Sequence, residues 1–190
     1  MPDLHINREK TALVVIDLQK GIAGQDAKPH SAQDVIRNAA KLAEAFRKNS
    51  MPVFLVHVMM TPEIALTTES DETFVRPAQL PPDWADIVPE LGPRPTDIVI
   101  TKRQWGAFYG TDLELQLRRR GKDTIVLCGI STDFGVESTA RFAYEYGFSQ
   151  IFAEDAMSAR SAEQHNAAVK YILRRLGRVR STMEILNAIS

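Results

Sequence analysis

The chain has almost no cysteine, and this excludes one class of protein. Cys128 is the only cysteine among the 190 residues, so no disulfide can form within the chain. Small secreted domains usually depend on disulfides, whereas a chain of this length can bury a sufficient apolar core without them. We therefore expect a cytoplasmic protein with one domain spanning residues 1–190.

An excess of charge of one sign is also lacking, and so is any long apolar run. The 23 basic and 24 acidic residues give a formal net charge of −1, which provides no electrostatic basis for binding nucleic acid or an anionic membrane. No apolar run approaches the length of a membrane-spanning helix, and the first ten residues contain no signal-like apolar core. We expect neither nucleic acid nor a membrane as a partner.

What the sequence does contain is a regular alternation of strand and helix patterns. The expected strands lie at 11–18, 53–58, 97–101, 124–128, 150–153 and 178–180. The expected helices lie at 31–49, 110–120, 134–146 and 161–175, with a last helix that begins at a capping box of Ser181 and Glu184. This order predicts an α/β fold with three layers, α/β/α, around a parallel sheet.

The segment 59–96 fits neither pattern. Prolines recur through it, so we predict an irregular loop with at most short helices. A long loop of this kind in a compact domain is usually a lid or a binding loop.

Three polar stretches follow the ends of expected strands. Asp17 ends the first strand, Lys102 follows the third, and a polar turn at 131–135 follows the fourth. In parallel sheets, ligands bind beyond the carboxyl ends of the strands, where the strand order reverses. These residues are therefore the candidate site. No glycine-rich phosphate-binding motif follows any strand, which disfavours a nucleotide-binding domain.

The same stretches carry a resemblance to a known family. The segments are VIDLQ (15–19), KRQWGAFYGTDL (102–113), GISTDFGVESTAR (129–141) and EDAMS (154–158). They resemble the isochorismatase-like, or cysteine hydrolase, superfamily. The resemblance implies a six-stranded parallel sheet of Rossmann-like topology and an assembly of two or four identical chains.

The family's catalytic triad of Asp, Lys and Cys is incomplete here. The resemblance assigns the first two roles to Asp17 and Lys102, but the position of the cysteine nucleophile is Gly135. Cys128 lies inside the preceding strand, where we expect a small buried core residue. The family also has a cis peptide bond before the residue that matches Ser131, and its Asn is replaced by Asp133. The chain thus resembles the branch in which glycine replaces the catalytic cysteine.

Without the thiol, amide hydrolysis by an acyl-enzyme route is disfavoured. Isochorismatases of this family also carry glycine here, and they cleave a vinyl ether that is activated by protonation. Asp17 would then be the acid, because burial at a strand end raises the pKa of a carboxyl group. Lys102 has the opposite effect, and an ionised Asp17 would act as a base that activates water. The sequence leaves both alternatives open. We expect Gly135 to leave extra room in the site.

The residues expected to bind the substrate lie beside these two. They are Ser131, Thr132, Asp133, Phe134, Trp105 and Tyr109. The hydroxyl groups more often form hydrogen bonds in turns than replace a nucleophile. The aromatic rings fit a planar substrate and, equally, a core or a subunit interface.

Metal ions and cofactors are not expected. His57 is a candidate ligand, since zinc-binding nicotinamidases of the family bind their metal just after this strand. The D-x-H cluster of ligands in those enzymes is absent from this sequence, so we interpret His57 as a strand residue that forms a hydrogen bond. His165 lies on a helix with no partner at a ligand spacing.

Two functions fit the sequence. The first is a hydrolase of the isochorismatase type that acts on a small molecule through Asp17 and Lys102. The second is a catalytically silent relative that binds a metabolite or a partner protein. Retention of both charged residues favours the hydrolase.

Overall fold

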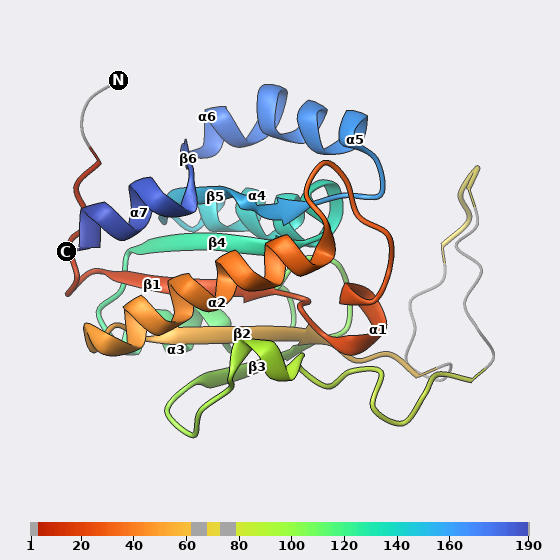
Figure 1. Ribbon diagram of the computed structural model, residues 1–190, viewed down its shortest axis with the longest axis horizontal. Helices are drawn as coiled ribbons and strands as arrows, with labels where there is room; N and C mark the ends of the chain where they lie inside the picture. The colour runs from red at the N-terminus through yellow and green to blue at the C-terminus, as the bar shows by residue number, and fades with distance from the viewer. Residues whose placement is uncertain (1–3, 62–67, 73–78, 190) are drawn as a thin grey trace.

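The computed structural model describes residues 4–61, 68–72 and 79–189, and its centre is a six-stranded sheet (Figure 1). All neighbouring strands are parallel, in the order β3-β2-β1-β4-β5-β6. The strands are β1 (Thr11–Ile16), β2 (Val53–Val58), β3 (Ile98–Lys102), β4 (Thr124–Ile130), β5 (Ser149–Ser158) and β6 (Arg178–Arg180). The predicted parallel α/β fold is confirmed.

Helices cover both faces of this sheet. In Figure 1, α2 passes in front of the strands while α3 and α4 lie behind them. The helices are α1 (Lys20–Ala23), α2 (Ala32–Lys48), η1 (Pro89–Leu91), α3 (Leu113–Arg119), η2 (Thr132–Val136), α4 (Glu137–Glu145), α5 (Ala162–Ala167), η3 (Ala168–Leu173), α6 (Arg174–Leu176) and α7 (Thr182–Ile189). None of the helices in the described ranges is both long enough and apolar enough to cross a bilayer.

The central strand β1 is apolar along its whole length because it is covered on both sides. Each of its residues is buried, and it pairs with β2 on one side and β4 on the other. A continuous apolar run is typical of such strands. The strand order reverses between β1 and β4, so their carboxyl ends flank the point where ligands bind in this kind of sheet.

Several strand boundaries differ from the predictions. The first strand ends at Ile16 rather than at residue 18, because Asp17 leaves the strand with a φ of 52°. The fourth strand does not end at Cys128 but continues through Gly129 to Ile130. Gly129 has a φ of 123°, and a Cβ there would lie 2.0 Å from the carbonyl oxygen of Ile16. Glycine thus allows β4 to approach β1 closely, and it does not break the strand.

The fifth strand runs to Ser158 instead of ending at residue 153, with an irregularity in its pairing opposite Leu127 and Gly129. Both long C-terminal helices contain π-helical turns that periodicity does not reveal, η2 and η3. Three predicted caps are confirmed. Ser161 accepts the backbone N–H of Gln164 at the start of α5. Ser31 accepts the backbone N–H of Asp34 at the start of α2. Ser181 and Glu184 form the reciprocal bonds of a capping box before α7.

The predicted loop at 59–96 is described only in part, since 62–67 and 73–78 lie outside the described residues. Its last part contains one short 3-10 helix, η1. Ile87 forms an isolated bridge with Gln19, just beyond β1. The end of this loop therefore lies against the carboxyl edge of the sheet.

Candidate active site

A buried ion pair joins the two charged residues that the sequence singled out. Lys102 Nζ donates to Asp17 Oδ2 at 2.7 Å and to the carbonyl oxygen of Gln104 at 3.0 Å. Asp17 is 4% exposed and Lys102 2% exposed. Because β2 lies between β1 and β3, the lysine side chain extends past the end of β2 to meet the carboxylate. The predicted convergence of Asp17 and Lys102 is confirmed.

The backbone at Asp17 directs this carboxyl group into the interior. Its φ of 52° lies in the left-handed region, which Asp tolerates better than most residues do. Its N–H donates to the carbonyl oxygen of Val56 at 2.9 Å, which anchors the residue to β2. Among the described residues, the second carboxyl oxygen, Oδ1, has no hydrogen-bond partner although it is buried. One oxygen is therefore fixed by Lys102 and the other is uncommitted.

Burial controls the protonation of Asp17. Loss of solvent around the carboxyl group raises its pKa from 3.8 to about 6, and the charge and hydrogen bond of Lys102 only partly oppose this rise. Burial disfavours the ionised form, while a neighbouring cation favours it. The effect of burial is larger here, so a protonated Asp17 is accessible near neutral pH.

Gly135 approaches this carboxyl group closely. A Cβ at this position would lie 2.9 Å from Ile16 Cγ2 and 3.1 Å from Asp17 Oδ2. The expectation that Gly135 leaves extra room is wrong, because Ile16 and Asp17 already occupy the space beside it. Glycine is needed here so that η2 can pack against the end of β1.

The polar side chains of the turn are engaged with one another or with a helix. Ser131 Oγ donates to Asp133 Oδ1, and Thr132 Oγ1 lies 2.9 Å from His165 Nδ1. Thr132 is fully buried. These contacts agree with hydrogen-bonding roles for the hydroxyls rather than a surrogate nucleophile. The peptide bond between Ile130 and Ser131 is cis, as the resemblance implied.

Two aromatic residues form an exposed pair beside Gly135. The rings of Trp105 and Phe134 meet edge to face, with their centroids 4.9 Å apart. They are 64% and 38% exposed. Tyr109 is also exposed, and its carbonyl oxygen accepts a bond from the side chain of Gln104. The structure thus places these rings at the surface instead of in the core, and their role in binding stays a prediction.

Gln19 is a residue to which sequence reasoning gave no role. Its fully buried amide accepts the N–H of Val58 at 2.8 Å and donates to the carbonyl oxygen of Val58 at 3.1 Å and to that of Trp84 at 3.3 Å. It therefore links the end of β2 to the proline-rich loop. A polar amide directly after an apolar strand is the signal that could have revealed this role.

His57 and Cys128, the other two candidates, have surroundings that fit a structural role. His57 Nδ1 lies 2.7 Å from the carbonyl oxygen of Ala85, and Nε2 lies 2.7 Å from Thr101 Oγ1. A carbonyl oxygen only accepts, so Nδ1 carries the proton and both ring nitrogens are occupied. Cys128 is fully buried, as predicted, and burial raises the pKa of its thiol to about 12.

Sequence reasoning also missed a cluster of His30, Glu154 and His165. Spacing along the helix places no second ligand-type side chain next to His165, but in the structure His30 and Glu154 lie beside it from other segments. The motif EDAMS includes Glu154, but nothing in the sequence indicates that two histidines lie beside it.

An open groove of about 800 Å³ lies elsewhere, along the solvent side of α2. Charged side chains line much of it, among them Arg37, Lys41 and Glu90. None of the residues around Asp17 contributes to this groove, so it is separate from the strand-end site.

Comparison with known proteins agrees with this geometry. The family model described as Isochorismatase domain matches residues 11–184. The chain belongs to the isochorismatase family. It is 56% identical to the uncharacterized isochorismatase family protein YecD of Escherichia coli O157:H7, over 98% of this chain and 100% of YecD. It is 50% identical to the uncharacterized isochorismatase family protein YwoC of Bacillus subtilis strain 168, over 100% of this chain and 99% of YwoC.

A solved isochorismatase family protein from Burkholderia thailandensis is 43% identical, with a TM-score of 0.93 over 97% of both chains. The family and fold that the motifs predicted are therefore confirmed, and the isochorismatase family includes hydrolases. The assignment to the branch with glycine in place of cysteine, and the catalytic roles of Asp17 and Lys102, stay predictions.

Replacing Lys102 by Met tests the buried ion pair of this isochorismatase family member. Leaving one buried charge without its partner typically costs about 3–5 kcal/mol of unfolding free energy. Loss of Lys102 removes the effects that lower the pKa of Asp17, so this pKa rises further. A pKa that is raised in the folded state gives stability at low pH that is lost as pH rises through it. We therefore expect Lys102→Met to cost much less at about pH 5 than at about pH 8.

Urea unfolding at both pH values measures this difference. Lys20→Met is the matched control, because its salt bridges with Asp83 and Asp86 are exposed, and solvent screening leaves such pairs with little effect on stability at either pH. Equal costs for Lys102→Met at the two pH values would contradict this account of the pair.

Replacing Gly135 by Ala tests the close packing of the turn. The added Cβ meets Ile16 and Asp17 and should cost about 1–3 kcal/mol by overpacking. The better helix propensity of Ala offsets at most about 1 kcal/mol of this cost, so we expect a net loss of unfolding free energy. Gly106→Ala is the control, since its Cβ would make an ordinary contact at 3.4 Å with Phe142. Thermal unfolding that ranks the two variants equally would argue against this packing.

Proposed function

We propose that this chain is a hydrolase that cleaves the vinyl ether bond of a small, planar or anionic molecule, with Asp17 as the proton donor. The observation that carries the proposal is the state of the Asp17 carboxyl group. Oδ2 is held by Lys102, while the buried Oδ1 has no hydrogen-bond partner among the described residues. Its pKa of about 6 supports a protonated form at working pH.

The proposed reaction begins with proton transfer from Asp17 to the terminal carbon of the enol ether. The carbon–carbon double bond supplies the electron pair, and the adjacent carbon becomes an oxocarbenium ion. Water adds to this carbon and returns a proton to the Asp17 carboxylate. The resulting hemiketal then breaks its bond to the leaving oxygen, which takes up a proton while the hemiketal hydroxyl loses one, and this gives a carbonyl compound and an alcohol.

Lys102 supports both halves of this cycle. Its ammonium group fixes Oδ2 at 2.7 Å, so the carboxyl group keeps one orientation. After proton transfer the same cation stabilises the carboxylate, and this limits the cost of forming a buried negative charge. Since Oδ1 is shielded from solvent, the covering side chains must move aside when the substrate enters.

Amide hydrolysis through a thiolate has little support in the described residues. The only thiol is that of Cys128, which is buried and has a pKa of about 12. At the position of the family nucleophile, Ile16 and Asp17 already lie where a side chain would begin. Proton-transfer chemistry needs neither a thiol nor an acyl-enzyme intermediate.

The exposed pair of Trp105 and Phe134 supports a planar substrate. Phe134 precedes Gly135 in the chain, and the carbonyl oxygen of Trp105 would lie 3.7 Å from a Cβ at Gly135. The two rings meet each other and present apolar surface that is not buried in the chain. Residues 131–134 of the turn are the other proposed wall of the site. The proposed partner is thus a small molecule, and assembly into dimers or tetramers stays a prediction from the family resemblance.

Turnover of isochorismate beside a panel of amides, followed by mass spectrometry, tests the proposal. We expect cleavage of the ether and no cleavage of the amides. Asp17→Asn cannot donate the proton and should lower turnover by about 100- to 10,000-fold. Asp26→Asn, on the exposed loop before α2, is the matched control and should keep full activity.

Three outcomes would overturn the proposal. Full turnover by Asp17→Asn would exclude Asp17 as the acid, and thermal unfolding of both variants distinguishes loss of the proton donor from loss of the fold. Amide cleavage would overturn the interpretation of Gly135. Binding of isochorismate without turnover would favour the catalytically silent alternative.

The pH dependence of kcat/KM distinguishes an acid from a base at Asp17. The protonated fraction falls as pH rises through the pKa of about 6. An acid role predicts the highest activity below about pH 6 and a loss of about tenfold per pH unit well above it. A base role predicts the opposite slope. A rate that rises with pH through this range would therefore contradict the proposed mechanism.

A further inference from the structure

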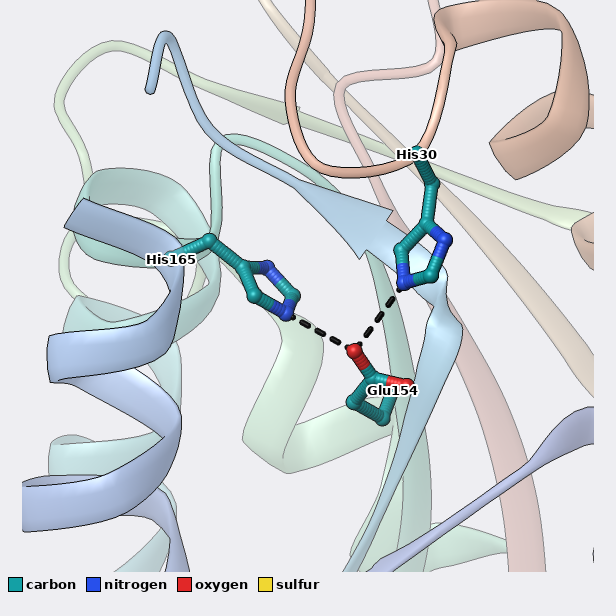
Figure 2. A group of neighbouring side chains, drawn as sticks. All are labelled: His30, Glu154 and His165. Carbon is teal, nitrogen blue, oxygen red and sulfur yellow. Dashed lines mark hydrogen bonds and ion pairs between the residues drawn. The ribbon is translucent and has the colours of Figure 1, made fainter. Parts of the chain in front are cut away.

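The side chains of His30, Glu154 and His165 converge from three separate segments (Figure 2). His30 lies on the loop before α2, Glu154 on β5 and His165 on α5. The Nε2 atoms of both histidines lie 3.0 Å from the same oxygen, Glu154 Oε1. One ligand atom from each residue lies within 4.8 Å of the other two. The cluster shares no residue with the Asp17–Lys102 pair.

From this arrangement we propose that His30, Glu154 and His165 bind a divalent first-row transition metal ion of the Zn²⁺ class. Ligands about 2.1 Å from a tetrahedral ion lie roughly 3.4 Å apart, so only small shifts would admit an ion between these atoms. Two imidazoles and one carboxylate form a ligand set that suits Zn²⁺ and related cations. The set contains no thiolate, so it does not depend on the single cysteine.

His165 has the second contact that is typical of a histidine ligand. Metal-bound imidazoles usually donate their other ring N–H to an oxygen, which fixes the orientation of the ring. Here Nδ1 of His165 lies 2.9 Å from Thr132 Oγ1, and the residue is fully buried. The Nε2 atom is thereby held toward Glu154.

His30 is fixed by its backbone. Its N–H donates to Ser158 Oγ at 3.1 Å, and the Ser158 hydroxyl donates to the His30 carbonyl oxygen at 2.7 Å. These two bonds attach the His30 loop to the end of β5, the strand that carries Glu154. The site is therefore built on a strand and a helix, with the loop tied to that strand.

The cluster is open on one side. The side chains of His30 and Glu154 are 29% and 34% exposed, whereas that of His165 is only 1% exposed. An ion has a route to the ligands, and water can complete its coordination.

A purely hydrogen-bonded cluster is the competing explanation. In that case both Nε2 atoms carry protons and Glu154 accepts from each of them. A metal ion would displace those two protons and bind all three groups. The two explanations differ in whether metal affinity depends on this set of side chains.

Zn²⁺ binding to the untagged full-length chain tests the proposal. After treatment with a chelator, titration calorimetry and elemental analysis should give one Zn²⁺ per chain. His30→Ala and Glu154→Gln change half-buried ligands, and each should weaken binding by more than about tenfold. His5→Ala removes an exposed histidine outside the cluster and is the matched control, expected to bind like the wild type.

Two further readouts keep this test decisive. Thermal unfolding without metal shows whether each variant is folded, and added Zn²⁺ should raise the Tm of the wild type but not that of His30→Ala. Co²⁺ should give a visible absorption band in the wild type that the ligand variants lack. No Zn²⁺ binding by the wild type, or equal affinity in the wild type and His30→Ala, would overturn the proposal.

Discussion

The buried pair of Asp17 and Lys102 is the interaction on which the site depends. Removing two charges from water is costly, and their attraction offsets this cost only when the geometry is good. Here the 2.7 Å contact exists because three neighbouring strands hold the two residues. Asp17 turns inward after β1, β2 anchors its N–H through Val56, and β3 ends with Lys102. The sheet thus fixes the geometry that the pair needs to offset the cost of removing its charges from water.

The pair is asymmetric, because the two oxygens of the Asp17 carboxyl group have different surroundings. A symmetric, fully bonded carboxylate beside a lysine would remain ionised and inert. Asp17 instead has one oxygen bound to Lys102 and another that is buried without a partner among the described residues. Burial then dominates its pKa. Gly135 belongs to the same arrangement, because a side chain there would press on Ile16 and on the lysine-bound oxygen.

The convergence of Asp17 and Lys102 in the candidate site could be predicted from the sequence, because topology alone brings the strand ends together. Asp17 and Lys102 follow apolar runs, and parallel strands place their carboxyl ends at one edge. The extent to which Asp17 is buried and the close packing at Gly129 and Gly135 could not be predicted, since they depend on tertiary contacts. Gly129 looks like a strand break, yet it lies within β4 where β1 approaches its backbone. His30 and Glu154 are 124 residues apart, and only the folded chain pairs them.

The short π-helical turn η2 connects the two clusters of polar residues. At its start, Thr132 contacts His165 at 2.9 Å. Three residues later, Gly135 packs against Ile16 and Asp17. The five-residue turn η2 therefore contacts both clusters, through Thr132 at its start and through Gly135 near its end. Neither contact follows from the neighbours of these residues in sequence, because the partners His165 and Ile16 lie in distant segments of the chain.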